Sequence, residues 1–213
     1  MTATLLLKNA LVIGTMDDQL RELANASVFI RGNKVEAVGP ASELPSEADK
    51  VIDMTGHVLI PGLINTHHHM FQSLTRALPA AQNAELFDWL TALFPVWQNI
   101  TPAMQRAATR TAMAELMLSG CTTAADHAYL YVNGTRLDDS VQAAEEMGMR
   151  FHAVRGAMSL GQSQGGLPPD ALVEQDEQAI LREMQRVVED LHDSAADAMI
   201  KVALGPCSPF TVT

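Results

Sequence analysis

The stretch Pro61-Gly62-Leu63-Ile64-Asn65-Thr66-His67-His68-His69 separates two parts of the sequence that follow different patterns. Its short apolar run, residues 63–65, is typical of a buried strand, and three consecutive histidines follow. In a strand, residues i and i+2 point to the same side, so His67 and His69 are predicted to face one point while His68 faces away. Two converging imidazoles suit tetrahedral zinc, but the spacing alone is equally compatible with a structural or surface role.

The residues before this stretch, 1–60, are short apolar runs separated by turn residues. Residues 27–31 and 34–39 flank Gly32-Asn33, a pair that tolerates the positive φ of a tight turn and therefore predicts a hairpin. A second turn is expected at Thr55-Gly56. We expect a small β-sheet here, too thin to be a domain on its own.

The residues after this stretch alternate between strand and helix patterns. Thr101 is placed to cap a helix that begins with Pro102, and Gly120 is placed to end it. Such an alternation predicts right-handed βαβ units around a parallel sheet. The predicted strands cover residues 63–65, 121–127, 150–155 and 199–204, and the predicted helices cover residues 102–119, 138–147 and 174–193.

Polar residues gather where the predicted strands end. In a (β/α) barrel these ends form the catalytic face. Four units make half a barrel, and a whole one typically needs about 250 residues, so we expect residues 1–213 to be the N-terminal part of a longer protein. The polar strand ends are His67 to His69, Asp126-His127, Arg155 and Cys207-Ser208.

Composition narrows the classes of function. The 213 residues include 14 basic and 25 acidic side chains, a formal net charge of -11, which argues against nucleic acid or an anionic membrane as a partner. There is no apolar run of membrane-spanning length and no N-terminal signal pattern, so a cytoplasmic location is expected. Cys121 and Cys207 fit no metal or redox spacing and are expected to be two buried free thiols.

The stretch from Pro61 to His69 resembles the signature of the amidohydrolase superfamily, in which the first and third histidines bind the metal. The resemblance implies an α/β fold: a (β/α)8 TIM-like barrel whose first four units are residues 61–213. It implies that residues 1–60 are the N-terminal part of a composite β-sandwich. His67 and His69 would be metal ligands. No catalytic acid or base is expected within the chain, because the family's remaining ligands and its proton-shuttling glutamate would follow Thr213.

Three segments narrow the resemblance to the 8-oxoguanine deaminase branch, which is related to guanine and S-adenosylhomocysteine deaminases and to s-triazine hydrolases. This implies zinc-dependent hydrolysis of 8-oxoguanine, a purine-like small molecule, to urate and ammonia, with iron as the alternative metal. It also implies a homo-oligomer that binds neither nucleic acid nor membrane. The segments are residues 67–76, 86–90 and 155–170.

Three residues are candidate substrate contacts. The Gln72 amide can both donate to and accept from a purine edge, which we favour over a plain loop role. Trp89 could stack on a planar ring, although it also belongs to an ordinary apolar helix face. His127 could orient the substrate or be a hydrogen-bonded structural histidine. For Arg155 we expect a structural ion pair.

Competing functions remain open at this point. The same fold and metal could hydrolyse an s-triazine, a pterin or guanine, or the protein could be an inactive relative that binds small molecules. The cytidine-deaminase class is excluded because it needs Pro-Cys-x-x-Cys, and Pro206-Cys207-Ser208-Pro209-Phe210 lacks the second cysteine.

Overall fold

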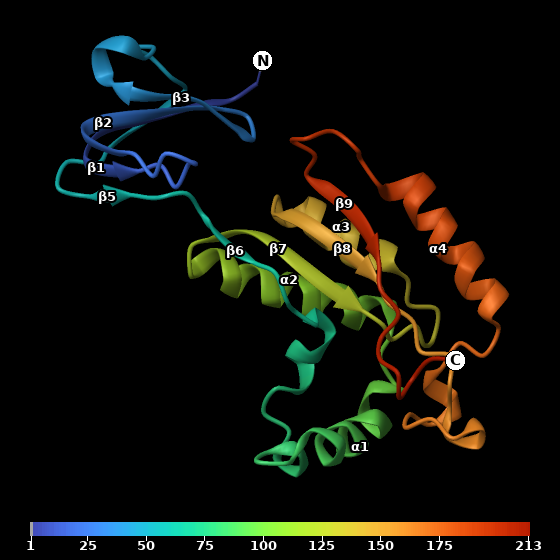
Figure 1. Cartoon of the computed structure of the whole chain (residues 1–213). Helices are drawn as coiled ribbons and strands as arrows, with labels where there is room; N and C mark the ends of the chain where they lie inside the picture. The colour runs from blue at the N-terminus through green and yellow to red at the C-terminus, as the bar shows by residue number, and fades with distance from the viewer. Residues whose placement is uncertain (1) are drawn as a thin grey trace. The chain divides into compact units, whose positions relative to one another are not determined.

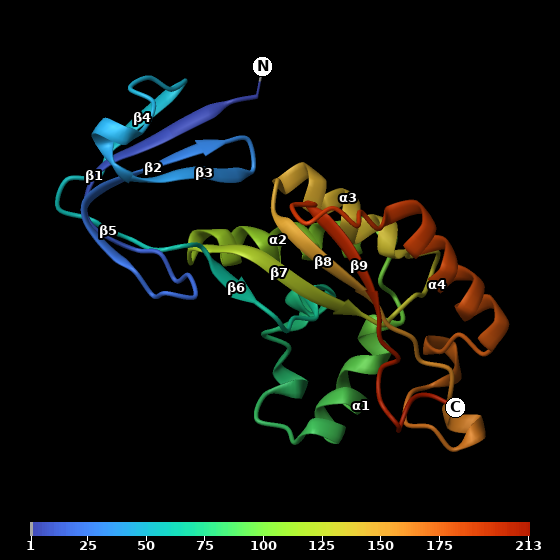
Figure 2. The ribbon, with the colours of Figure 1, turned by 45° about the horizontal axis from the view of Figure 1, so that its top comes forward.

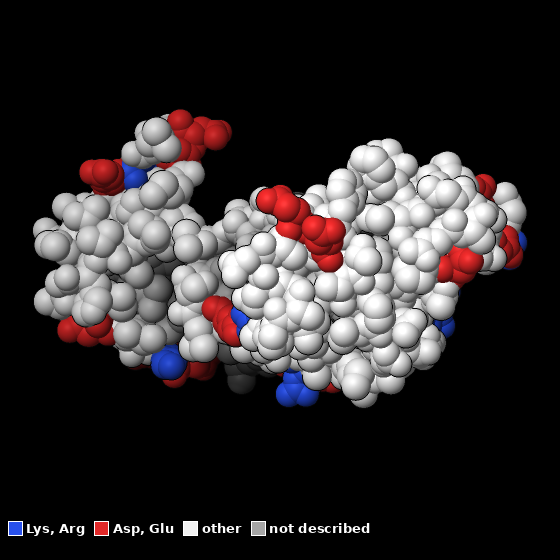
Figure 3. Space-filling model, turned by 90° about the horizontal axis from the view of Figure 1, so that it is seen from below, with Lys and Arg blue, Asp and Glu red and all other residues white. Residues whose placement is uncertain are grey.

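The computed structural model describes residues 2–213, and its backbone separates into two compact units, Met1–Gly62 and Leu63–Thr213 (Figure 1). Each unit is described by itself. Within the described residues no helix combines the length and the apolar character that crossing a membrane requires. In the view of Figure 3, Lys and Arg side chains are isolated groups among wide uncharged areas.

Unit 1 is a five-stranded sheet in the order β3-β2-β1-β4, with β5 also paired to β1. The predicted hairpin at Gly32-Asn33 is confirmed: β2 and β3 pair antiparallel and Gly32 has a φ of 59°. The elements are β1 (Thr4–Gly14), β2 (Glu22–Arg31), β3 (Lys34–Pro40), the 3-10 turn η1 (Ala41–Glu43), β4 (Lys50–Asp53) and β5 (Val58–Leu59).

The two apolar runs at the start of the chain form one strand, β1, with a bulge inside it. Its register with β2 shifts between Leu7 and Ala10. Asn9 lies there with a φ of 63°, a conformation that asparagine tolerates better than most residues. The Asn9 N–H donates to Ser27 Oγ (3.1 Å), so the backbone group left unpaired by the bulge is satisfied.

Unit 2 contains a four-stranded parallel sheet in the order β6-β7-β8-β9, as the alternating pattern predicted. Because the order is sequential and such crossovers are right-handed, the helices that directly precede β7, β8 and β9 lie on one face of the sheet (Figure 2). The strands are β6 (Leu63–Asn65), β7 (Cys121–Ala128), β8 (Arg150–Arg155) and β9 (Ile200–Leu204). The helices are α1 (Leu86–Trp97), α2 (Pro102–Leu118), α3 (Leu137–Met147) and α4 (Glu177–Leu191), with 3-10 turns η2 (Met70–Thr75), η3 (Pro79–Ala81), η4 (Gln162–Gln164) and η5 (Asp170–Leu172).

The ends of two helices follow from their capping residues. Thr101 Oγ1 accepts from the Met104 N–H, which confirms the predicted start of α2. Helix α4 begins three residues later than predicted, because Asp176 caps it by accepting from the Ala179 N–H (3.1 Å). Glu174 lies outside the helix, where it pairs with Arg155.

The main core of unit 2 lies between the sheet and the helices. Met113 from α2, Val141 from α3 and Val187 from α4 pack with Phe151 and Val202 of the strands. Both cysteines are free thiols, as predicted. Cys121 is buried, but Cys207 is only half-buried, so the expected burial is confirmed for Cys121 alone. The sheet is therefore held from one side by three helices, and the residues at its strand ends are fixed to a packed frame.

Candidate metal and substrate site

The three histidines follow β6 instead of lying in it, which corrects the expected strand geometry. Strand β6 ends at Asn65, and the His67 N–H donates to Asn65 Oδ1 (3.2 Å) as the chain turns out of the sheet. The rings of His67 and His69 still lie close together, with centroids 4.9 Å apart at an interplanar angle of 81°. His67 is exposed and His69 is half-buried. We call residues 66–70 the histidine segment.

The imidazole of His69 has a fixed tautomer. Its Nδ1 lies 2.8 Å from the backbone carbonyl oxygen of His127. A carbonyl only accepts, so Nδ1 carries the hydrogen and Nε2 keeps a free lone pair. Burial lowers the pKa of His69, which favours the neutral ring. A neutral imidazole whose other nitrogen donates to a carbonyl is the usual state of a metal-binding histidine.

His68 is held differently from its two neighbours. It is half-buried, its Nδ1 has no hydrogen-bond partner among the described residues, and burial together with the nearby Arg76 lowers its pKa. Its backbone carbonyl accepts from the His127 N–H (2.9 Å). His68 therefore contributes to the site through its backbone.

The end of β7 lies against the histidine segment. This agrees with the prediction that the polar residues at the strand ends share one face of the sheet's end. Besides the two hydrogen bonds at His127, the Met70 N–H donates to Asp126 Oδ1 (2.7 Å). Asp126 is completely buried, and this burial raises the pKa of its carboxyl group to about 7, against the opposing effect of the Met70 N–H. Its Oδ2 has no hydrogen-bond partner in residues 2–213.

Gln72 lies on η2, directly after the histidine segment. Its Nε2 donates to the hydroxyl of Tyr129 (3.0 Å), and the Tyr129 ring lies 5.1 Å from His69 and 5.6 Å from His127. Tyr129 was not among the predicted site residues. Its position just after Asp126-His127, at the end of a predicted strand, was the available signal. Burial raises its pKa further above the ordinary value, so the hydroxyl remains protonated.

The side chain of His127 joins the ends of two strands. Its Nε2 lies 2.7 Å from the carbonyl oxygen of Gly205, just after β9, so Nε2 carries the hydrogen. The His127 ring is also 5.5 Å from that of His69. His127 is thus a hydrogen-bonded structural residue beside the candidate ligands, and a direct role toward substrate stays a prediction.

Trp89 lies on α1 and packs in an aromatic cluster that continues to the site, because Phe71 of this cluster meets Tyr129 edge to face at 5.3 Å. Its ring meets Trp97 edge to face at 5.4 Å, and Trp97 meets Phe71 at 5.1 Å. Among residues 2–213, the ring contacts of Trp89 include neither His67 nor His69. The structure therefore does not bring Trp89 to the histidines directly, and its role as a pocket wall stays a prediction.

Arg155 forms the structural ion pair that the sequence analysis expected. It is 1% exposed, its Nη2 donates to both carboxylate oxygens of Glu174 (2.7 and 2.9 Å), and its guanidinium lies 3.7 Å from the centre of the Tyr131 ring. The Glu174 N–H also donates to the Met158 carbonyl (2.8 Å). Arg155 therefore holds the loop between β8 and α4 in place.

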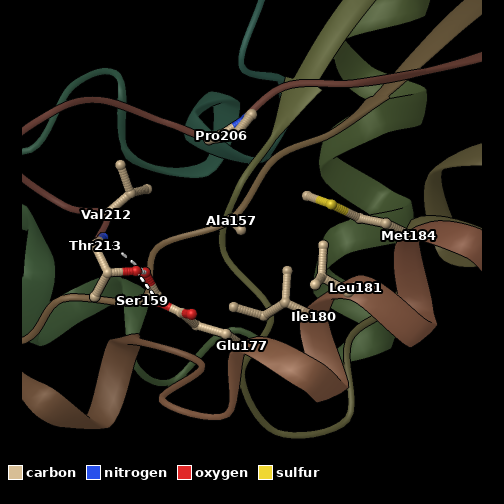
Figure 4. A pocket seen from close by; sticks show the side chains of 9 residues that line it. All are labelled: Ala157, Ser159, Glu177, Ile180, Leu181, Met184, Pro206, Val212 and Thr213. Carbon is tan, nitrogen blue, oxygen red and sulfur yellow. Dashed lines mark hydrogen bonds between the residues drawn. The ribbon is translucent and has the colours of Figure 1, made fainter.

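A cavity of about 290 Å³ lies elsewhere in unit 2 and contains none of the predicted site residues (Figure 4). Its wall is mainly apolar and comes from α4, the loop after β8 and the segment after β9. Its polar groups include Ser159 and Thr213, whose hydroxyls lie 3.1 Å apart. The complete lining is Ala157, Ser159, Glu177, Ile180, Leu181, Met184, Pro206, Val212 and Thr213.

The donor set at the strand ends fits part of a zinc site. His67 and His69 present two neighbouring imidazoles, and the tautomer of His69 leaves Nε2 free to bind a metal. Within residues 2–213, no three or more His, Cys, Asp or Glu side chains are grouped so that they could hold a metal ion. Structural and catalytic zinc sites use at least three protein ligands, so two histidines need further donors.

Comparison with known proteins places this parallel sheet and its histidines in a family. Residues 58–213 match the family model described as "Amidohydrolase family", and the chain belongs to that family. It is 44% identical to the 8-oxoguanine deaminase of Pseudomonas aeruginosa over 209 residues, which cover 97% of this chain and 46% of that protein.

Two further relatives carry other ring substrates in their names. An isoxanthopterin deaminase from an unknown prokaryotic organism is 33% identical over 94% of this chain and 43% of its own length. The crystal structure of an atrazine chlorohydrolase from Arthrobacter aurescens TC1 complexed with zinc superposes with a TM-score of 0.89 at 30% identity, covering 98% of this chain and 48% of that one. The chain thus spans about half the length of the relatives it matches.

Proposed function

We propose that this chain is part of a zinc-dependent aminohydrolase that converts 8-oxoguanine to urate and ammonia. The observation that carries the proposal is the Nδ1 hydrogen bond of His69, which prepares Nε2 as a metal ligand beside His67. The purine substrate is supported by the 44% identity to an 8-oxoguanine deaminase. Other partners follow from the same proposal: a small purine-like molecule, and a second copy of the protein in a homo-oligomer.

The proposed fold extends the observed one. We propose that β6 to β9 are the first four strands of a (β/α)8 barrel, and that residues 1–60 form the N-terminal part of a β-sandwich. This is supported by the sequential parallel order of the sheet and by relatives of about twice this length. The missing metal ligands and the proton-transferring residue would then come from sequence beyond Thr213.

His67 and His69 would hold the zinc ion, with iron as the alternative metal. When bound, zinc supplies a nucleophilic water at neutral pH, because it lowers the pKa of that water to about 7. In the net reaction the water oxygen bonds to the ring carbon that carries the exocyclic amine. The bond from that carbon to the exocyclic nitrogen breaks; one proton of the water goes to this nitrogen, which leaves as ammonia, and the other goes to the adjacent ring nitrogen as the new carbonyl forms.

Gln72, His127 and Trp89 are the proposed substrate contacts. The Gln72 amide donates to Tyr129 through Nε2, so its Oε1 remains available to accept an N–H from a purine edge. His127 donates through Nε2 to Gly205, so its Nδ1 is the free acceptor. Trp89 would reach the substrate ring from the aromatic cluster in which it packs on α1.

A second candidate keeps the reaction type and changes the ring. The 33% identity to an isoxanthopterin deaminase and the structural likeness to an atrazine chlorohydrolase favour a pterin or an s-triazine as the alternative substrate, and guanine is a further one. All these rings are planar and carry a leaving group on a carbon between ring nitrogens. The same two histidines would serve each of them.

The test uses the full-length zinc-loaded protein. Ammonia release is measured from 8-oxoguanine, isoxanthopterin, guanine and a hydroxylated aminotriazine, and 8-oxoguanine is expected to give the highest kcat/KM. Zinc content is measured in His67→Ala and His69→Ala, with His57→Ala, an exposed histidine of unit 1, as the matched control. Unchanged zinc in both site variants would refute the ligand assignment, and no ammonia from 8-oxoguanine would refute the substrate.

A further inference from the structure

We propose that Asp126 is a positioning residue for the metal site, because its buried carboxylate holds the backbone just after His69 and so directs the His69 ring. This rests on the proposed function, since it assumes that His69 binds the metal. Asp126 would not touch the metal or the substrate. It would act through the single hydrogen bond that its Oδ1 accepts from the Met70 N–H (2.7 Å).

Strand β7 holds His69 through the backbone on both sides of it and through its ring. The carbonyl before it, on His68, accepts from the His127 N–H at 2.9 Å. The N–H after it, on Met70, donates to Asp126, and the ring itself donates to the His127 carbonyl at 2.8 Å. Three hydrogen bonds to two consecutive residues of one strand therefore fix both the backbone and the side chain of His69.

The Met70 N–H depends on Asp126 for its hydrogen bond. Met70 is the first residue of η2 and is completely buried. The first N–H groups of a helical turn have no partner within the turn, and a buried N–H without a partner is unfavourable. Without the Asp126 acceptor, the buried Met70 N–H would be unpaired. The backbone of the histidine segment would then shift to a position in which this N–H has another acceptor.

The buried position of Asp126 is unfavourable for a carboxylate. Asp126 is 0% exposed, has one partner for Oδ1 and none among the described residues for Oδ2. A buried carboxylate with so few partners is destabilising compared with an apolar residue of similar size. By contrast, the buried hydroxyl of Ser140 has both Gln105 (2.9 Å) and Thr109 (3.2 Å) as partners. A residue that costs stability at this place indicates a functional constraint.

Two substitutions separate positioning from charge. Asp126→Asn keeps the Oδ1 acceptor and nearly the same shape, so it should keep zinc affinity within about threefold of wild type. Asp126→Leu keeps the branching of the side chain and removes the acceptor, although its methyl groups are larger than the carboxylate oxygens. Loss of a residue that orients a metal ligand typically costs 10-fold to 100-fold in metal affinity, so we expect at least a tenfold loss for Asp126→Leu.

The experiment measures the zinc dissociation constant of the full-length protein by competition with a chromogenic chelator. His69→Ala and Ser140→Ala are measured alongside, the latter as a control for a disturbed buried polar group away from the site. A tenfold or greater loss in Asp126→Leu, with Asp126→Asn and Ser140→Ala close to wild type, supports the inference. If Asp126→Leu does not fold, Asp126→Asn decides, because a tenfold loss there would mean that charge and not positioning matters.

The outcomes separate the two proposals. Unchanged zinc affinity in His69→Ala would refute the ligand assignment on which the inference depends. Loss of affinity in His69→Ala together with wild-type affinity in a folded Asp126→Leu would overturn the positioning role alone. The visible absorption of the cobalt-substituted protein gives a second readout: its bands should change in Asp126→Leu and stay the same in Asp126→Asn.

Discussion

The ring of His69 donates through Nδ1 to the backbone carbonyl of His127, at 2.8 Å. The orientation of a candidate metal ligand therefore depends on the backbone of residue 127, while the side chain of the same residue binds the Gly205 carbonyl. The backbone of His127 therefore orients His69, and its side chain binds Gly205. A substitution at residue 127 can remove the side-chain hydrogen bond and keep the backbone one.

His127→Ala is expected to keep the zinc and to lose stability. The variant retains the carbonyl that orients His69, but it leaves the Gly205 carbonyl without its donor (2.7 Å). We expect a loss of about 1 kcal/mol in the free energy of unfolding, measured with urea. Zinc content should stay at the wild-type level, and a zinc-free His127→Ala protein would contradict this account.

Tyr129→Phe is expected to raise KM. The variant removes the hydroxyl that accepts from Gln72 Nε2 (3.0 Å), so the Gln72 amide loses its fixed orientation. The net value of one hydrogen bond is about 1 kcal/mol, which corresponds to a roughly fivefold increase in KM for 8-oxoguanine. Tyr131→Phe is the matched control, because the Tyr131 hydroxyl binds the Ala128 carbonyl instead (2.9 Å). An equal rise in KM in both variants would argue against a specific role of Gln72.

Gly156→Ala is expected to disturb the site through packing. A Cβ at this position would lie 2.6 Å from Tyr129 Cβ, 2.7 Å from His127 Nε2 and 2.8 Å from the Ala128 carbonyl oxygen. Such overpacking typically costs 1–3 kcal/mol, here roughly 2, and it would move the His127 ring. Gly14→Ala is the control, because its nearest neighbour would be 3.6 Å away. Thermal unfolding of both variants measures the difference, and equal stabilities would contradict the close approach.

Arg155→Met is expected to be strongly destabilising. It would leave Glu174 without the partner that it contacts through both oxygens. Removal of one partner of a fully buried ion pair costs about 3–5 kcal/mol, and because the Glu174 side chain is 26% exposed we expect a loss at the lower end, about 3 kcal/mol. The matched variant is Arg76→Met, which breaks an exposed pair with Glu115 (2.6 Å) and should change stability far less. Chemical denaturation compares the two. If Arg155→Met were as stable as Arg76→Met, the buried pair would not hold the β8 to α4 loop.

Glu183→Gln is expected to change stability in a pH-dependent way. Arg186 first, and then Arg136, lower the pKa of Glu183 below its ordinary value of 4.5. A lowered pKa in the folded state stabilises the fold above the ordinary pKa, and this contribution disappears as the pH falls through the folded pKa. Wild type should therefore be more stable than Glu183→Gln at pH 7, by at most about 1 kcal/mol for this solvated pair.

The control for this prediction is the pH itself. The difference in unfolding free energy between wild type and Glu183→Gln should stay constant from pH 7 to pH 5 and shrink below the ordinary pKa of 4.5. A difference that grew toward acidic pH would have the wrong sign for a lowered pKa. Arg186 of α4 also binds Asp138 of α3 (2.6 Å), and Glu183→Gln leaves this ion pair in place. The electrostatic contact between α3 and α4 is therefore weakened and not abolished in the variant.

Much of the fold could be predicted because its determinants are local. The periodic apolar faces, Thr101 at the start of α2 and Gly148 at the end of α3 set the helix positions within a few residues. The strand and helix alternation predicted a parallel sheet, and the resemblance to a family of (β/α)8 barrels implied the sequential strand order that is observed. Local patterns failed at Asn9, where one strand with a bulge looked like two, and at Glu174, whose partner is 19 residues away.

The sequence by itself determined that two histidines follow the first strand of unit 2 and that Asp126 and His127 end the next strand. Only the tertiary structure decided the tautomer of His69, the burial of Asp126, the place of Tyr129 and the packing of Trp89 on Trp97. The physical reason is distance along the chain. The hydrogen bonds from the end of β7 to the histidine segment and Gln72 join residues 56 to 59 positions apart, and no local pattern records the distance or direction between two strands once they pair.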